Sequence, residues 1–154
     1  MDQEILLAQI RQIDPQNQIS PKKADRIALE ITATSLHEVM RTMRQQPDLG
    51  FDMLCSHTAV DWLENGFELI YVLYSTQFRQ SLMIIVNIPR ENPVIPTVSD
   101  IWLTAEAQER EVFDLFGVQY DHHPDLRRLF LEDDWVGYPM RKDYKDDFML
   151  ESTE

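Results

Sequence analysis

Two segments whose apolar side chains alternate with period two constrain the fold of this chain most strongly. They are residues 67–74 and 82–88, and in both of them the intervening positions are largely apolar as well. Period-two alternation is typical of a strand, and apolar side chains on both faces indicate a sheet that is covered on both sides, or nearly so. A polar stretch at 75–81 joins the two predicted strands. The chain is therefore expected to form a central sheet with other elements packed against it.

Three further segments carry apolar residues at helical spacing. The first covers 3–13. The second begins behind Ser35, which has the spacing of a capping box with Glu38. The third begins behind Thr104 and is stopped by Gly117, a residue type that favours the position just after a helix. The spacing thus predicts three helices.

The remaining strand and loop signals lie between these helices. Residues 26–33 alternate with period two and predict a strand, and 51–62 gain β-branched and aromatic residues toward their end. Asn65 and Gly66 both tolerate positive φ and predict a hairpin turn. Three prolines in 89–100 predict an ordered loop or an extended strap.

Behind Gly117 the periodicity fades, and no internal repeat or second domain is evident. The predicted fold class is α+β, with a single core domain at 1–117. It has a mixed or antiparallel sheet of about four strands packed with two or three helices. Residues 118–154 are predicted to form an extended C-terminal arm that docks on a partner subunit.

The charge of the chain disfavours several kinds of partner. Acidic residues outnumber basic ones by 27 to 14, for a net charge of −13. Such a field repels nucleic acid and anionic membrane surfaces. The longest aliphatic run, 82–86, is far shorter than the ~18–20 residues that cross a bilayer, and the acidic start at 1–4 does not resemble a signal peptide. We expect a cytosolic-type chain that meets a membrane only through partners.

Few side chains suggest catalysis. The single cysteine, Cys55, excludes cysteine-only iron–sulfur or zinc sites within this chain, and we expect it to be a small buried residue in a reducing compartment. His122 and His123 lie beside aspartates, but neighbouring residues of an extended chain point to opposite sides and rarely share one metal ion. Cys55 and His57 are two residues apart, yet nothing near them suggests an oxyanion hole. Only four unclustered glycines occur, which disfavours a nucleotide loop.

The arm combines charge with aromatic rings. Residues 109–154 contain thirteen acidic and six basic residues, and eight aromatic residues are interleaved with them. A solvated tail does not need so many rings. Either the rings pack back on their own domain, or the arm lies along a partner with its rings as anchors and its arginines paired to carboxylates. Composition favours neither interpretation.

Three motifs in this part of the chain resemble the signature of one family. They are EREVFDLFG at 109–117, HPDLRR at 123–128 and DWVGYPMRKDY at 134–144. Their order and separations resemble the C subunit of respiratory complex I, the 30-kDa subunit family, which includes the J subunit of the photosynthetic NDH complexes. His122 stands where a glycine is more usual in that family.

The resemblance implies a non-catalytic peripheral-arm subunit of a proton-translocating NADH-quinone oxidoreductase on the cytoplasmic side of the membrane. It implies no cofactor in this chain, with iron–sulfur clusters, quinone, and NADH or FMN bound by other subunits. The implied partners are the large quinone-site subunit and the neighbouring iron–sulfur subunits. The predicted partner-interface residues are Glu109, Arg110, Glu111, Asp114, His123, Pro124, Arg127, Arg128, Trp135, Tyr138, Arg141, Lys142, Asp143 and Tyr144.

Spacing adds one local prediction within the first motif. Arg110 and Asp114 are four residues apart on a helix and are predicted to pair, which leaves Glu109 and Glu111 free for the arginines of the arm or for partner cations.

Two alternatives remain open at this point. The chain is the equivalent subunit of a membrane-bound hydrogenase or a formate-oxidising complex, or it is a stand-alone metal-dependent hydrolase using His122, His123 and Asp125.

Overall fold

The computed structural model describes residues 3–13, 20–22 and 27–149. Their main feature is a five-stranded sheet with the order β1-β2-β5-β4-β3. Its strands are β1 (Ser20–Lys22), β2 (Ala28–Glu30), β3 (Met53–Asp61), β4 (Phe67–Ser75) and β5 (Gln80–Ile88). β2 pairs with β5 in parallel and the other pairs are antiparallel, so the sheet is mixed. The predicted α+β class is confirmed, and the short edge strand β1 is an addition to it.

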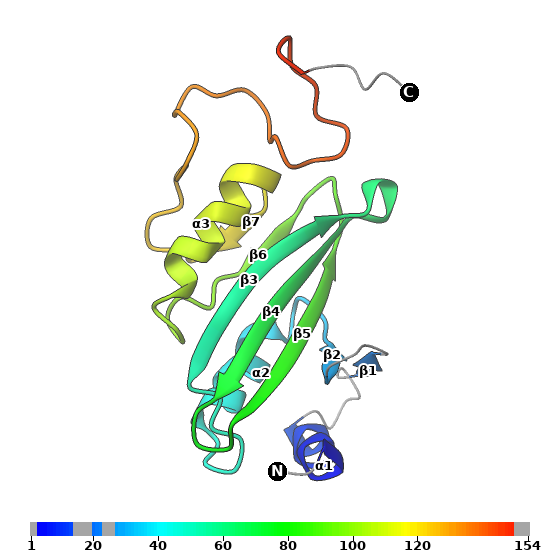
Figure 1. The fold of residues 1–154 in the computed structure, drawn as a ribbon, viewed down its shortest axis with the longest axis vertical. Coiled ribbons are helices and arrows are strands. Elements are labelled where there is room, and N and C mark those ends of the chain that lie inside the picture. The colour runs from blue at the N-terminus through cyan, green and yellow to red at the C-terminus, as the bar shows by residue number, and fades with distance from the viewer. Residues whose placement is uncertain (1–2, 14–19, 23–26, 150–154) are drawn as a thin grey trace.

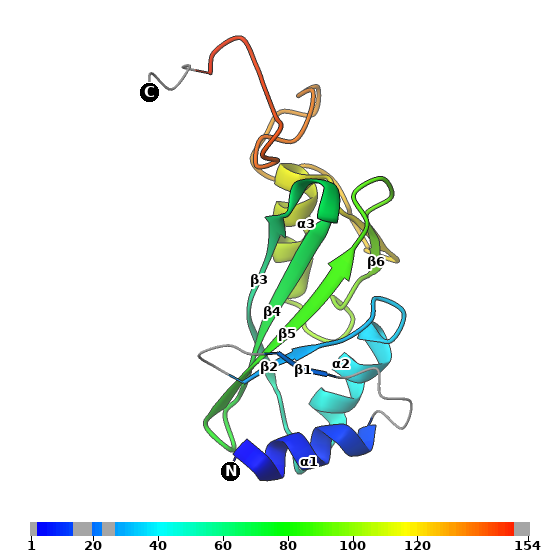
Figure 2. The ribbon, with the colours of Figure 1, turned by 90° about the vertical axis from the view of Figure 1, so that its right-hand side faces the viewer.

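Three helices pack around this sheet, as predicted. They are α1 (Gln3–Ile13), α2 (Leu36–Gln45) and α3 (Ala105–Phe116). β3, β4 and β5 run the length of the domain, with α1 and α2 near one end and α3 near the other (Figures 1 and 2). A separate pair of parallel strands consists of β6 (Val94–Pro96) and β7 (Gln119–Asp121). It joins the proline-rich strap to the segment that follows α3 in the sequence. No helix in the described ranges is long and apolar enough to cross a membrane.

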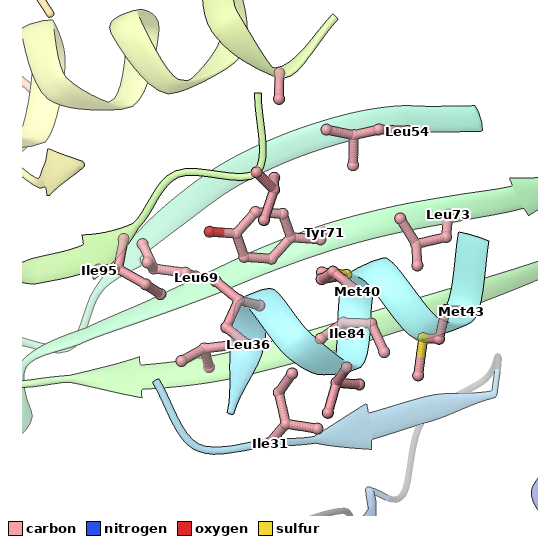
Figure 3. Packing of buried hydrophobic residues seen from close by; sticks show 14 of the residues in the cluster. Ile31, Leu36, Met40, Met43, Leu54, Leu69, Tyr71, Leu73, Ile84 and Ile95 are labelled. Atoms are coloured by element: carbon pink, nitrogen blue, oxygen red, sulfur yellow. The ribbon is translucent and has the colours of Figure 1, made fainter. Parts of the chain in front are cut away.

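The core lies on one face of the long strands. Figure 3 shows Leu69, Tyr71 and Leu73 of β4 gathered around α2, which contributes Met40 and Met43 to the same cluster. All five are buried. The alternate positions of β4 are only half-buried, so one face of the sheet is closed and the other is partly covered.

One predicted local detail is wrong. Ser35 has helical φ and ψ, and its hydroxyl donates to the carbonyl of Thr32 at 3.1 Å instead of capping α2.

The hairpin turn predicted at Asn65 and Gly66 is confirmed, because β3 and β4 pair antiparallel on either side of it. Gly66 and Leu63 have positive φ in this turn (89° and 55°), and Asn65 does not. A 3₁₀ turn, η1 (Leu63–Asn65), fills this connection.

Cys55 is exposed, so the expectation of burial is wrong. The register of β3 against β4 shifts between Leu54 and Ser56. A β-bulge of this kind inserts one unpaired residue and breaks the alternation of faces. Cys55 therefore points outward while His57 is buried, and the two side chains do not share a face.

The turn at Gly66 generates a stability prediction. Its φ of 89° and ψ of −155° lie in a region that is essentially restricted to glycine, and an added Cβ would stand 2.3 Å from the carbonyl oxygen of Ile88. We expect Gly66→Ala to lower the free energy of unfolding by about 3 kcal/mol in urea denaturation. Asn65→Ala, at the exposed neighbour, is expected to change it by less than about 0.5 kcal/mol. Equal effects would contradict this account of the turn.

Candidate functional site

The described part of the predicted arm, residues 118–149, lies against the end of α3. Its first residues form β7, and Val118 and Tyr120 are buried in the core. From residue 122 to 149 the chain has no helix or strand and runs beyond the end of α3 (Figure 1). The boundary predicted at 117 stays a prediction, but the chain remains within the β6–β7 pair up to Asp121.

One buried carboxylate, that of Asp114 on α3, holds the middle of the arm. Its Oδ2 accepts hydrogen bonds from the backbone N–H groups of Leu129, Phe130 and Leu131 at 3.1, 2.7 and 3.0 Å. Its Oδ1 accepts one from Arg128 Nη1 at 2.9 Å. Burial raises the pKa of Asp114, but these hydrogen bonds outweigh burial and hold the pKa below its ordinary value. Asp114 is therefore a charged anchor inside the chain.

Arg128 completes this anchor from the arm side. Its Nη1 also donates to the carbonyl of Asp114, and its Nη2 donates to the carbonyls of Trp135 and Gly137 at 3.0 Å each. The guanidinium lies 5.1 Å from the centre of the Tyr138 ring. One planar side chain thus binds α3 and two later points of the arm.

Arg110 also binds backbone and not a carboxylate. Its Nε and Nη2 donate to the carbonyls of Arg127 and Arg128 at 3.1 and 3.0 Å. The predicted Arg110–Asp114 pair is wrong, because Asp114 is occupied by Arg128 and three amides.

A second anchor ties the arm to the β3–β4 turn. Asp61, at the end of β3, accepts hydrogen bonds from Arg90 and from the N–H groups of Leu63 and Lys142. Burial raises the pKa of Asp61, and these donors more than offset it, so the pKa is lowered. Arg90 also contacts Asp143 at 2.5 Å. No sequence pattern pointed to Asp61 or Arg90, because a single acid at a strand end has no spacing signal.

A third contact explains Gly117. It ends α3 with φ 79°, and an added Cβ would lie 2.6 Å from the Tyr138 ring and 2.7 Å from Arg141. Arg141 Nε donates to the carbonyl of Phe116 at 2.7 Å. The guanidinium of Arg141 also lies 4.9 Å from the centre of the Tyr138 ring. The predicted stop of α3 is confirmed, and it also makes room for the arm.

Glu109 is fully buried and holds the strap. Its Oε1 accepts a hydrogen bond from the N–H of Val98 at 2.8 Å, and its Oε2 is 2.5 Å from the hydroxyl of Thr97. Burial, with a smaller effect of Asp100, raises the pKa of Glu109 to about 7. The expectation that Glu109 is free for cations is wrong, since its carboxyl lies between α3 and the strap.

His57 and His123 are held by hydrogen bonds within the chain. His123 Nδ1 accepts the N–H of Asp125, and its Nε2 lies 3.0 Å from the carbonyl of Glu106, so Nε2 is the donating ring nitrogen. His57 is stacked on Tyr71, its Nδ1 is 3.0 Å from the carbonyl of Ile70, and burial lowers its pKa to about 4. Sequence spacing gave no sign that the Nε2 of His57 would lie 2.6 Å from the Tyr120 hydroxyl.

His122 is exposed and has φ 65°, a left-handed conformation that suits the glycine expected at this position. Among the described residues, no group of three or more His, Cys, Asp or Glu side chains is arranged to hold a metal ion. The geometry therefore gives no support to a hydrolase built on His122, His123 and Asp125.

The remaining predicted interface residues divide by exposure. Tyr138, Arg141 and Tyr144 are half-buried against the chain itself. Their role toward a partner stays a prediction. The exposed members are Glu111, Pro124, Arg127, Trp135, Lys142 and Asp143.

The buried anchor predicts a large effect of one substitution. Both carboxylate oxygens of Asp114 accept hydrogen bonds. In Asp114→Asn the new side-chain NH₂ group would face N–H donors of the arm, and Arg128 would lose its charge partner. We expect the free energy of unfolding to fall by about 3–5 kcal/mol in urea denaturation. Asp125→Asn removes an exposed ion pair with Arg127 and should cost under about 1 kcal/mol. Similar losses of unfolding free energy in the two variants would contradict the role of Asp114 as the main buried anchor of the arm.

Glu109 predicts a pH dependence of stability. Its pKa is 4.5 ordinarily and about 7 in the folded chain, so between these values only the folded state holds the proton. The free energy of unfolding should therefore fall by up to about 3 kcal/mol as pH rises from 4.5 to 7. In Glu109→Gln the amide oxygen can still accept from the N–H of Val98, and the amide nitrogen can donate to the Thr97 hydroxyl oxygen, so this variant should lack this part of the dependence. Parallel pH profiles for wild type and variant would count against it.

Comparison with known proteins agrees with the motifs. The model of the family described as respiratory-chain NADH dehydrogenase, 30 Kd subunit, matches residues 29–147. The NADH-quinone oxidoreductase C subunit of Moorella thermoacetica is 39% identical over 119 residues, which cover 77% of this chain and 79% of that protein. The NADH-quinone oxidoreductase C/D subunit of Phocaeicola vulgatus is 48% identical over 119 residues, but the match spans only 22% of its length.

Two solved structures share the fold. A chain of the membrane-bound sulfane sulfur reductase, an archaeal respiratory membrane complex, aligns with a TM-score of 0.78 and 29% identity, over 92% of this chain and 85% of that one. A trypsin-resistant fragment of Nqo5 aligns with a TM-score of 0.64 and 28% identity, over 82% of this chain and all of the fragment. Motifs, family match and relatives agree, and the chain belongs to the 30-kDa subunit family of respiratory-chain NADH dehydrogenases.

Proposed function

We propose that this chain is a non-catalytic subunit of the peripheral arm of a proton-translocating NADH-quinone oxidoreductase. Its role is to position the large quinone-site subunit and the neighbouring iron–sulfur subunits for electron transfer to quinone. The observation that carries this proposal is the arm, whose buried charges are satisfied within the chain while aromatic and acidic side chains face outward. Such an ordered surface suits binding to a partner and not catalysis.

The names of the relatives support one partner in particular. In Phocaeicola vulgatus a protein named as a C/D subunit contains a region like this chain within a much longer polypeptide. Fusion keeps two parts together at high effective concentration, which is useful when they act as neighbours. We therefore propose the protein that corresponds to the D part as the direct partner, and we refer to it as the D-type subunit.

We further propose that the redox groups of the complex lie in other subunits. One cysteine cannot supply a cysteine-ligated cluster. In His57 and His123 both ring nitrogens already make hydrogen bonds within the described part of the chain, so neither side chain is well placed to bind a metal ion. The chain would then sit on the cytoplasmic side of the membrane and reach it only through the complex.

The same fold in a sulfane sulfur reductase complex supports a second candidate. The chain would then be the equivalent subunit of another respiratory membrane complex, such as a membrane-bound hydrogenase or a formate-oxidising complex. Both candidates assign the chain the same scaffolding role, so the proteins that purify with it decide between the two.

A tagged chain, expressed from its own locus and purified in mild detergent, tests the proposal. We expect it to migrate on a native gel with the D-type subunit and iron–sulfur subunits, in a band that reduces quinone with NADH. Deleting the chain should lower quinone reduction in proportion to the loss of assembled complex.

Different outcomes would separate the candidates. A band that evolves hydrogen and lacks NADH-dependent quinone reduction would favour the second candidate. Turnover of a substrate by the isolated chain, or a redox centre bound to it, would contradict a non-catalytic role in either complex.

A further inference from the structure

One exposed part of the described arm is a short loop that combines acidic with apolar side chains. We call residues 130–136 the acidic loop. It contains the consecutive acids Glu132, Asp133 and Asp134, all exposed, followed by Trp135 and Val136. Val136 is 87% exposed and Trp135 39% exposed. Exposed apolar surface beside charges, nearly complete at Val136 and partial at Trp135, is typical of a binding surface.

Asp114 and Arg128 fix the conformation of the acidic loop at its two ends. Asp114 binds the amides of residues 129–131 at its start, and Arg128 binds the carbonyls of Trp135 and Gly137 at its end. A turn within it is closed by the N–H of Trp135 bonding to the carbonyl of Glu132 at 3.0 Å. A loop fixed at both ends loses little conformational entropy on binding.

The charged side chains of this region differ in whether they face the chain or the solvent. Three arginines of the arm and of α3 turn inward, because Arg110, Arg128 and Arg141 bind carbonyls or the buried Asp114. Arg127, Lys142 and Lys145 are exposed. Within the part of the chain that the structure describes, the three acids of the loop form no ion pair. The exposed Arg127 is paired with Asp125, so the unpaired charge on the loop itself is negative. The use of arginine forks toward a partner stays a prediction.

The negative charge of the acidic loop indicates a protein partner with positive charge. An anionic leaflet would repel three consecutive carboxylates, even though Trp135 and Val136 are apolar. A protein surface with an apolar pocket rimmed by lysine or arginine would satisfy both parts of the loop.

We propose that the acidic loop is a preformed docking element that inserts Trp135 and Val136 into a basic-rimmed apolar pocket of the D-type subunit. This inference deepens the proposed function and rests on it. It assigns the chemistry of the contact, which the family relation leaves open.

Rebinding to the complex tests this assignment. The full-length chain is added to the D-type subunit with its bound iron–sulfur subunits, purified from a strain that lacks this chain, and the affinity is measured at several salt concentrations. We expect Asp133→Asn/Asp134→Asn to weaken binding about tenfold at low salt and to reduce its salt dependence. Val136→Ser should weaken binding about fivefold at all salt concentrations.

Matched controls lie elsewhere on the surface. Glu38→Gln/Asp48→Asn removes two acids at α2 and the loop behind it, and Leu103→Ser removes a 79% exposed apolar side chain. Both should bind like wild type. Crosslinking from residue 136 should reach the D-type subunit.

The outcomes distinguish this proposal from the one it rests on. If wild type fails to rebind, the proposed function and the docking element both fall. If wild type rebinds and the loop variants match it, only the docking element is overturned. Binding of wild type to phosphatidylcholine–phosphatidylglycerol vesicles that Val136→Ser abolishes would assign the loop to membrane and also overturn it.

Discussion

The buried carboxylate of Asp114 is the interaction on which the shape of the C-terminal third depends. An isolated buried charge is costly, and this one is stable because an arginine and three consecutive amides surround it. Each of those donors belongs to residues 128–131, so satisfying the charge fixes the path of the chain. Without this anchor, a segment with no helix or strand of its own would have little to define it.

Many residues of the family motifs therefore stabilise the fold of this chain itself. Glu109 secures the strap, Arg110 and Arg128 hold backbone carbonyls, and Gly117 leaves space for Tyr138. The two interpretations of the aromatic residues are each supported for some of them. Phe116 and Tyr120 are buried in the core, whereas other rings of the arm are exposed and available to a partner; these are Phe130, Trp135 and Phe148.

Elements with periodic patterns were predictable and contacts between distant polar residues were not. The alternation of β4 and the spacing of α3 depend on local geometry, so the sequence alone located both. Spacing suggested Arg110 as the partner of Asp114, but the fold supplied Arg128, fourteen residues away. The bulge that exposes Cys55 likewise depends on how β3 registers against β4 and leaves no trace in composition. The motifs identified where the site lies, and only the structure showed that Arg110, Arg128 and Arg141 bind groups of the chain itself.

Hydrogen exchange on the isolated full-length chain tests most directly whether the arm is ordered by its own domain. The amides of Phe130 and Leu131, bonded to Asp114, should exchange as slowly as those of a stable turn packed on α3. The amides of the outer loop that make no such bond should exchange much faster. Random-coil exchange at Phe130 and Leu131 in the absence of any partner would contradict the account, because it would mean that a companion's surface and not Asp114 orders the arm.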